Sequence, residues 1–469
     1  MRLPRGIAGV ALATSLFALT VAQAGEYGGS GGLLPAGTNL GDDQLDQPRE
    51  LFVSERQHGG KSYMVILGDM AFNAPSILGG AARQIGISCN SCHLNGTSNP
   101  LLYIPGMSIV PGTFDTTGPL FNPKANNGIV DAVTPPSLRG ARFLWPYGHD
   151  GRMPSLRDFV HGVIVNEFKG PEPAPEILEA LVAYITDIDF LPNRRLDQGG
   201  KLTGMKSAAE KRGEALFYKP FKHDPELSCA GCHIPSSAFV DHRAHDVGSE
   251  GLFKTPTLLD VVVNGPYFHD GRYGTIEDVV AHFDRLFYLG LSAQDRQDLV
   301  AYVKAIGSTD DPYVRDSVDV RLREINTFMT VLDTAIPEQN KAIVSLTVDT
   351  VGRELREFME MFPERKNTSV SGGADERSKA RSSLKELVLD LRQIDAAAAD
   401  GRFDEATSAL ATYRAEMSAA VPSLKAAEPW SLFDLARHDA HFASIRQLNH
   451  AAIDPVEAAA AMLRRFDND

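Results

Sequence analysis

Cysteine and tryptophan are scarce in this chain, and long apolar runs are almost absent. Its 469 residues include four cysteines and two tryptophans. So few cysteines exclude a disulfide-rich scaffold. The one long apolar run, residues 6–21, is shorter than the roughly 20 residues that a membrane-spanning helix needs. We therefore expect no membrane span.

Positive charge is also in deficit. The chain carries 46 Lys and Arg against 60 Asp and Glu, a net charge of −14. A nucleic-acid-binding protein needs a positive surface to meet the phosphates, so we expect no nucleic-acid partner. The negative charge would attract a basic protein partner, such as a small positively charged electron carrier, or would serve only solubility.

The first 24 residues have the pattern of a signal peptide. Arg2 and Arg5 precede the apolar run, and residues 22–24 (Ala-Gln-Ala) fit a small-residue cleavage site. This pattern predicts an exported, periplasmic protein whose mature chain begins near Gly25.

All four cysteines fall into two frames of the same form. The frames are Cys-Asn-Ser-Cys-His at residues 89–93 and Cys-Ala-Gly-Cys-His at residues 229–233. C-x-x-C-H is typical of c-type haem attachment. The two sulfurs form thioether bonds along one edge of the porphyrin, and the histidine binds the iron. The sequence therefore predicts two covalently bound haem c groups, held by Cys89, Cys92 and His93 and by Cys229, Cys232 and His233.

Three other uses of such cysteines were considered. A structural zinc site needs four ligands, usually from two nearby pairs, whereas these pairs begin at residues 89 and 229, 140 positions apart. A thioredoxin-like pair needs one motif in a βαβ setting, which the sequence does not show. Structural disulfides remain an alternative, but they would leave both histidines unexplained.

The segment after each cysteine frame is repeated. Residues 136–160 and 256–280 align without a gap, and both contain Pro-Tyr-x-His-Asp-Gly-Arg, at 146–152 and 266–272. Each copy later reaches a helical Leu-Val-Ala-Tyr stretch, from Leu181 and from Leu299. The pattern indicates one duplicated unit of helix, haem loop, turn and closing helices.

These observations predict an all-α fold of two tandem cytochrome c-like domains followed by a helical bundle. We place the first haem domain at residues 50–191 and the second at residues 204–307. Residues 313–469 show apolar residues at helical spacing and contain no cysteine, which predicts a helical bundle of unknown role.

With both C-x-x-C-H anchors and residues 253–283, the chain resembles the bacterial di-haem cytochrome c peroxidase and MauG superfamily. The resemblance implies that one haem takes electrons from a small donor protein, a cytochrome c or a cupredoxin, and passes them to the other, where peroxide is reduced. It also suggests an interdomain calcium ion. We expect a di-haem oxidoreductase that reduces hydrogen peroxide. The alternatives are an electron-transfer cytochrome without substrate chemistry and a MauG-like oxidase of a partner protein.

The sixth iron ligands depart from the family pattern. The position where the family's second haem takes a methionine or tyrosine ligand is Phe283 here, and its counterpart in the first copy is Val163. Neither side chain can bind iron. His282, Met153 and Tyr273 are the alternative ligands, and a five-coordinate iron is the other option.

Several further residues are candidates for catalysis. The repeated histidines, His149 and His269, have either a distal or propionate-side role or only hold the turn. The repeated arginines, Arg152 and Arg272, pair either with haem propionates or with surface acids. Glu277 is either a distal acid–base group or a residue that interacts favourably with the dipole of its helix. The rare Trp145 relays electrons or packs. The five catalytic candidates are His149, His269, Arg152, Arg272 and Glu277.

Overall fold

The computed structural model describes residues 34–450, apart from residues 36, 42–43, 119, 308–311 and 365–370. The predicted signal peptide lies outside the described residues. In this part of the chain, none of the helices has the length and apolar character needed to cross a membrane.

Helices make up most of the regular structure, which confirms the all-α class. The described strands form two antiparallel pairs of three residues each, β1 (Asp46–Pro48) with β4 (Tyr313–Arg315) and β2 (Ala244–Asp246) with β3 (Leu252–Lys254). The cytochrome c-like character of the two haem regions and the bundle character of the tail stay predictions.

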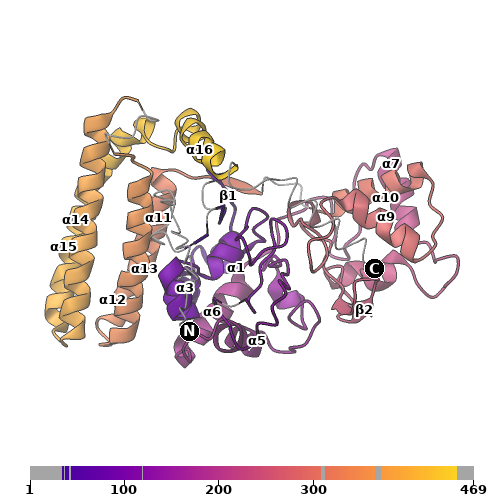
Figure 1. The fold of residues 1–469 in the computed structure, drawn as a ribbon, viewed down its shortest axis with the longest axis horizontal. Coiled ribbons are helices and arrows are strands. Elements are labelled where there is room, and N and C mark those ends of the chain that lie inside the picture. The colour runs from indigo at the N-terminus through magenta and orange to yellow at the C-terminus, as the bar shows by residue number, and fades with distance from the viewer. Residues whose placement is uncertain are drawn as a thin grey trace, which may run out of the picture.

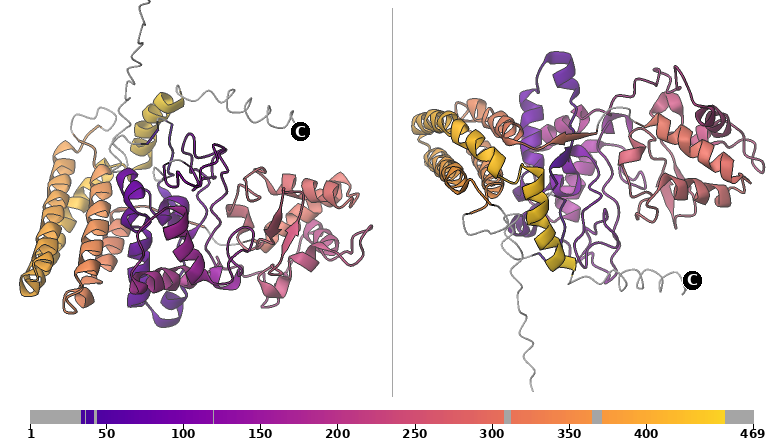
Figure 2. Two further views of the ribbon diagram at one scale, coloured as in Figure 1. Left: turned by 60° about the horizontal axis from the view of Figure 1, so that its bottom comes forward. Right: turned by 90° about the horizontal axis from the view of Figure 1, so that it is seen from above.

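Three groups of helices lie side by side, with the first unit between the tail and the second unit, as Figures 1 and 2 show. The first unit, residues 50–191, has α1 (Val53–His58), α2 (Tyr63–Phe72), α3 (Gly80–Ile85), α4 (Cys89–Cys92), α5 (Leu156–Gly162) and α6 (Pro175–Asp187). The second unit, residues 204–307, has α7 (Ala208–Phe217), α8 (Cys229–Cys232), α9 (Ile276–Leu286) and α10 (Ala293–Ile306). The tail has α11 (Val318–Met329), α12 (Leu332–Ala335), α13 (Lys341–Glu360), α14 (Ala374–Ala399), α15 (Phe403–Ala427) and α16 (Leu435–His450).

Each unit is built on one close pair of helices. In the first unit α2 packs on α6, and in the second α7 packs on α10. A Cβ added to Gly68 of α2 would lie 1.9 Å from the carbonyl oxygen of Ala180, and one added to Gly213 of α7 would lie 2.0 Å from that of Asp298. Only glycine allows this approach, so the two glycines fix how near the helices lie.

The same helix pair shows which residues of the expected leading helix are repeated, a match that was not predicted from the sequence. Residues 61–72 and 206–217 both read Lys-Ser, then Gly-Asp or Gly-Glu, then a closing phenylalanine. In both, the serine caps the helix and the lysine pairs with the acidic residue, Lys61 with Asp69 at 2.6 Å and Lys206 with Glu214 at 2.5 Å.

Within the described residues, the tail packs on the first unit. One hydrophobic cluster runs from α2 and α6 through α11 and α13 into α14 and α15, while the second unit has a cluster of its own. The helix α14 begins at Ala374, with Asp375 and Glu376 in its first turn. Acidic residues at that end are favourable because they face the positive end of the helix dipole.

Candidate haem sites

The first cysteine frame forms a single helical turn, α4, that ends at its histidine. Ser88 precedes the turn and exchanges capping hydrogen bonds with Ser91. His93 leaves the helical conformation, with φ −113° and ψ 65°. Its Nδ1 donates to the carbonyl oxygen of Pro136 at 2.9 Å. The hydrogen bond fixes the tautomer and leaves Nε2 as the nitrogen that can bind iron.

The second frame repeats this arrangement. α8 is again one turn, capped by Ser228, whose hydroxyl accepts from the amide of Gly231. His233 Nδ1 lies 3.2 Å from the carbonyl oxygen of Phe239, and the carbonyl of Pro256 is a second acceptor. A backbone carbonyl therefore orients each expected iron ligand, that of Pro136 for His93 and that of Phe239 for His233.

The protonation states suit haem attachment. Burial lowers the pKa of His93 to about 4 and also lowers that of His233. Both imidazoles are therefore neutral at pH 7, the form that ligates metal. All four cysteines are free thiols. The donor set of each frame, two thiols and a neutral imidazole with a directed Nε2, fits a haem c.

The two units hold one another through a reciprocal clasp. The amide of Thr134 donates to the carbonyl oxygen of His269, and the amide of Lys254 donates to the carbonyl oxygen of His149, each at 2.7 Å. Thr134 and Lys254 are equivalent positions of the repeat. We call these two hydrogen bonds the reciprocal clasp. Through it, the turn that contains His269 contacts the segment leading to Pro136 of the first unit. The turn that contains His149 likewise contacts the segment leading to Pro256 of the second unit.

The candidate histidines 149 and 269 both lie at this junction. His149 Nε2 donates to the carbonyl oxygen of Thr134 at 2.6 Å, and burial lowers its pKa to about 4. The His269 ring stacks on Phe253 with 3.7 Å between centroids. Its Nδ1 is buried, with no hydrogen-bond partner in the described part of the chain. A distal or propionate-side role for either residue stays a prediction.

The candidate arginines already have carboxylate partners. Arg152 pairs with Asp150 at 3.1 Å and with Glu167 at 2.8 Å. Arg272 pairs with Asp270 at 2.6 Å. A role at the haem propionates would have to share these guanidinium groups, and it too stays a prediction.

Glu277 lies on the surface rather than in a pocket. Its carboxylate pairs with the ammonium group of Lys304 at 2.7 Å, and both side chains are about half exposed. The hydrogen bond from Lys304 lowers the pKa of Glu277. The carboxylate is therefore ionised at neutral pH. To act as an acid–base group at a haem, the Glu277 side chain would have to leave Lys304 and move to another position.

The candidate sixth ligands have different surroundings. His282 Nδ1 lies 2.9 Å from the hydroxyl of Tyr273, and its Nε2 donates to the carbonyl oxygen of Val247 at 2.7 Å. Both ring nitrogens are engaged, so binding iron would require the ring to leave these partners. Met153 is half-buried and pairs through its backbone with Tyr147, just as Tyr273 pairs with Tyr267. Ligation by any of them stays a prediction.

The sequence analysis missed several contacts between the units. The His242 ring stacks on Trp145 at 4.0 Å, and its Nδ1 donates to the Trp145 carbonyl oxygen at 2.6 Å. The Lys254 ammonium donates to the carbonyls on either side, those of Leu144 at 2.6 Å and Pro146 at 2.8 Å. No sequence spacing announces such contacts. The one sequence signal for these contacts was that Lys254 occupies the same position of the repeat as Thr134.

One more cross-unit contact is an ion pair, Arg139 with Asp260. Their nearest atoms are 4.0 Å apart, and both side chains are almost fully buried. Asp260 also accepts from the amide of Leu191 at 3.1 Å. The Nε of Arg139 has no partner among the described residues. A buried donor without a partner fits an anionic group of a bound cofactor at this junction.

Comparisons with known proteins point to the same chemistry. The sequence model of the di-haem cytochrome c peroxidase family matches residues 207–366. The gamma subunit of hydrazine synthase from Kuenenia stuttgartiensis is 27% identical over an alignment 307 positions long that covers 52% of this chain and 78% of that protein.

Two further relatives match over shorter stretches. MauG of Methylorubrum extorquens is 30% identical over 21% of this chain and 35% of its own length. The cytochrome c peroxidase IdrP1 of Denitromonas iodatirespirans is 39% identical over 14% of this chain and 20% of its own length. The chain thus spans about a third or less of these two relatives. The chain is similar to di-haem cytochrome c peroxidases and MauG, and residues 207–366 carry the family match.

Proposed function

We propose that the protein is an exported di-haem c-type oxidoreductase that reduces hydrogen peroxide with electrons from a small carrier protein. The observation that carries the proposal is the pair of cysteine–histidine turns, each with an imidazole oriented by a backbone carbonyl, joined by the reciprocal clasp. The family match in residues 207–366 supports it. The periplasm is the proposed compartment because thioether-bound haem and the predicted signal peptide both suit export.

Each part of the site has one task in this proposal. When bound, a haem supplies an iron that takes and gives single electrons. His93 and His233 hold the irons from one side, and the cysteines fix the porphyrins. The clasp keeps the two units at a constant separation, which electron exchange between them requires. The overall reaction takes two electrons and two protons for each peroxide and releases two waters.

Trp145 is the proposed electron relay between the units. Its indole is half exposed in the protein chain and lies flat against His242 of the second unit. The contacts from Lys254 to the neighbouring carbonyls hold its backbone. An aromatic ring held by both units is suited to pass an electron between them.

The donor and the calcium ion follow from charge and resemblance. A basic cytochrome c or a cupredoxin is the proposed donor, because the net charge of −14 attracts a positive partner. The one cluster with metal-ligand spacing among the described residues is Cys232, Asp241 and His245. Calcium prefers oxygen ligands, so this cluster does not suit it, and an interdomain calcium ion stays a proposal from resemblance alone.

Stopped-flow mixing of the reduced holoprotein with hydrogen peroxide and a reduced carrier tests the function. Two carriers oxidised for each peroxide is the expected result. Spectra with both irons low-spin in every redox state and no carrier oxidation would instead indicate an electron-transfer cytochrome. Oxidation of a side chain on a bound partner protein would indicate MauG-like chemistry.

A further inference from the structure

The contact between the tail and the first unit contains charged side chains that the proposed reaction does not use. Acidic groups come from both sides, Glu50 and Asp69 from the first unit and Glu324 and Glu354 from α11 and α13. Two cations lie among them: Lys61 pairs with Asp69 at 2.6 Å, and Arg321 lies 3.8 Å from Glu354. We call these six residues the carboxylate cluster.

The cluster is largely shielded from water. Side-chain exposure is 6% for Asp69, 8% for Glu354, 12% for Lys61 and 26% for Glu50. The carboxylates outnumber the cations, four to two, so full ionisation would leave excess negative charge in a poorly solvated place. Burying unpaired charge is costly, and such groups bind protons instead.

Other charged and titratable groups face the cluster from each neighbouring element. They do not cancel the excess. The facing cations have carboxylate partners of their own, Glu357 for Arg353 at 2.7 Å and Asp260 for Arg139 at 4.0 Å. Asp316 pairs with the cluster cation Arg321 at 2.8 Å and so adds a further negative charge. Among the described residues, the facing groups are Glu55 of α1, Arg139 of the first unit, Tyr184 of α6, Asp316 before α11, and Arg353 and Glu357 of α13.

A chain of aromatic contacts leads from the cluster to the expected ligand of the first iron. The hydroxyl of Tyr184 donates to Glu50 at 2.8 Å. The Tyr184 ring contacts that of Phe72 at 4.9 Å between centroids, and Phe72 lies 6.5 Å from the His93 ring. Two rings therefore separate a cluster carboxylate from His93. Through such a poorly polarisable path, a change of charge at one end is felt at the other.

The second unit has no such cluster, although it has the same helix pair. Phe217 and Tyr302 repeat the aromatic contact at 5.1 Å, and Lys206 repeats the lysine pair with Glu214. No tail helix covers this face in the described part of the chain. The tail therefore makes the two equivalent sites electrostatically different.

We propose that the carboxylate cluster is a proton-binding site linked to the first haem, which takes up a proton from water when that haem accepts an electron from the donor. The electron and the proton enter together, so the interior charge stays balanced. Burial and neighbouring carboxylates raise the pKa of Glu50 and of Glu354 to about 7, which places proton exchange in the range of neutral pH. The inference rests on the proposed haem loading, and it assigns the tail a role in tuning one haem.

Spectroelectrochemical titration of the full-length di-haem protein at pH 6, 7 and 8 tests the inference. One of the two haem potentials should fall as pH rises, by roughly half of the ~59 mV per pH unit that one proton per electron would produce. The other potential should change much less.

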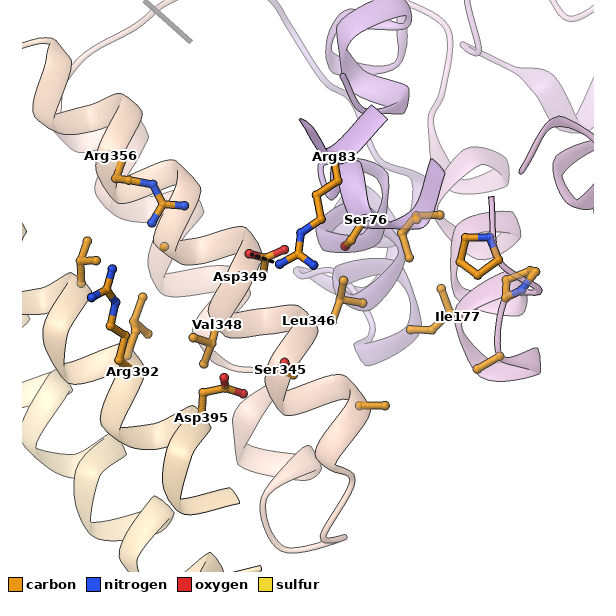
Figure 3. A pocket seen from close by; sticks show the side chains of 18 of the residues that line it. Ser76, Arg83, Ile177, Ser345, Leu346, Val348, Asp349, Arg356, Arg392 and Asp395 are labelled. Carbon is orange, nitrogen blue, oxygen red and sulfur yellow. Dashed lines mark ion pairs between the residues drawn. The ribbon is translucent and has the colours of Figure 1, made fainter. Parts of the chain in front are cut away.

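Two variants and a control locate the effect. Glu354→Gln on the tail side and Glu50→Gln on the first-unit side should each flatten the pH dependence of that one potential. Asp349→Asn is the control, because Asp349 lies on the same helix at the same contact but pairs at the surface with Arg83 at 3.7 Å (Figure 3). It borders a cavity of 540 Å³ outside the cluster and should leave the slope unchanged.

Two results would overturn the inference. One is a pair of potentials that do not vary between pH 6 and 8 in the unmodified protein. The other is an unaltered slope in both glutamine variants. Neither result depends on peroxide turnover, and a failure of peroxide turnover with the slope intact would reject only the proposed function.

Discussion

The amide of Thr134 lies 2.7 Å from the carbonyl oxygen of His269, a residue of the other haem unit. Two residues beyond Thr134, the carbonyl of Pro136 accepts the hydrogen bond that orients His93. A short stretch of backbone therefore connects the expected ligand of the first iron with the histidine turn of the second unit. The connection is reciprocated through Lys254, and it makes the junction part of both sites.

Replacing Lys254 by methionine should weaken this junction. The ammonium group donates to two carbonyls of the first unit, and methionine would leave both without their donor. We expect a loss of about 1–3 kcal/mol in the free energy of unfolding, measured by urea denaturation. Lys304→Met is the matched control, since its exposed pair with Glu277 should contribute under about 1 kcal/mol. Equal losses in the two variants would count against a stabilising role of the Lys254 ammonium contacts.

Gly68→Ala should disrupt the helix pair of the first unit. The new Cβ would meet the carbonyl oxygen of Ala180 at 1.9 Å, so α2 and α6 would have to separate. Overpacking of this kind typically costs about 1–3 kcal/mol. Thermal unfolding should show a lower Tm, while Gly60→Ala, where a Cβ meets nothing within 4 Å, should not. An unchanged Tm for Gly68→Ala would contradict the close packing.

Glu354→Gln should change the pH dependence of stability between pH 5 and 8. Glu354 has a pKa raised from 4.5 to about 7 in the folded chain. Between these values the folded state binds more protons at this group than the unfolded state, so its contribution to the free energy of unfolding decreases as pH rises. The buried histidines His93 and His149, whose pKa values are lowered to about 4, contribute in the opposite direction, so the test compares the variant with the unmodified protein. In urea titrations, the stability of Glu354→Gln relative to the unmodified protein should rise by about 2 kcal/mol between pH 5 and 8, and a constant difference would show that this carboxyl stays ionised.

Glu277→Gln should have little effect on peroxide turnover. The carboxylate is paired with Lys304 at the surface, and its lowered pKa leaves no proton to donate at pH 7. We expect kcat/KM to stay within about twofold of the unmodified protein. General acid–base groups contribute about 10²–10⁴-fold, so a loss of that size would establish Glu277 as the acid–base residue.

Cys229→Ala with Cys232→Ala should remove one haem and leave the other. Each frame forms its own turn, and each histidine has its own backbone carbonyl partner, so the sites should load independently. Intact-mass spectrometry should show one haem addition instead of two. Loss of both additions would indicate that the first site needs the second unit in place.

The extent to which the site could be predicted differs from residue to residue. The two cysteine frames and the repeated turns are local patterns, so the sequence was enough to find them. The duplicated helix of residues 61–72 escaped notice because only Lys, Ser, Gly and the closing Phe match its partner, while the apolar positions differ. Glu277 was chosen from its place in the repeat. The sequence did not show that it pairs with Lys304 of α10.

By itself, the sequence determined the haem-attachment frames, the duplication and the helical class, because each depends on residues close together along the chain. Tertiary structure alone decided which residues of the two units touch and where the tail packs. The reciprocal clasp and the carboxylate cluster join residues more than 100 positions apart, and such contacts depend on how whole helices pack, which no local spacing encodes.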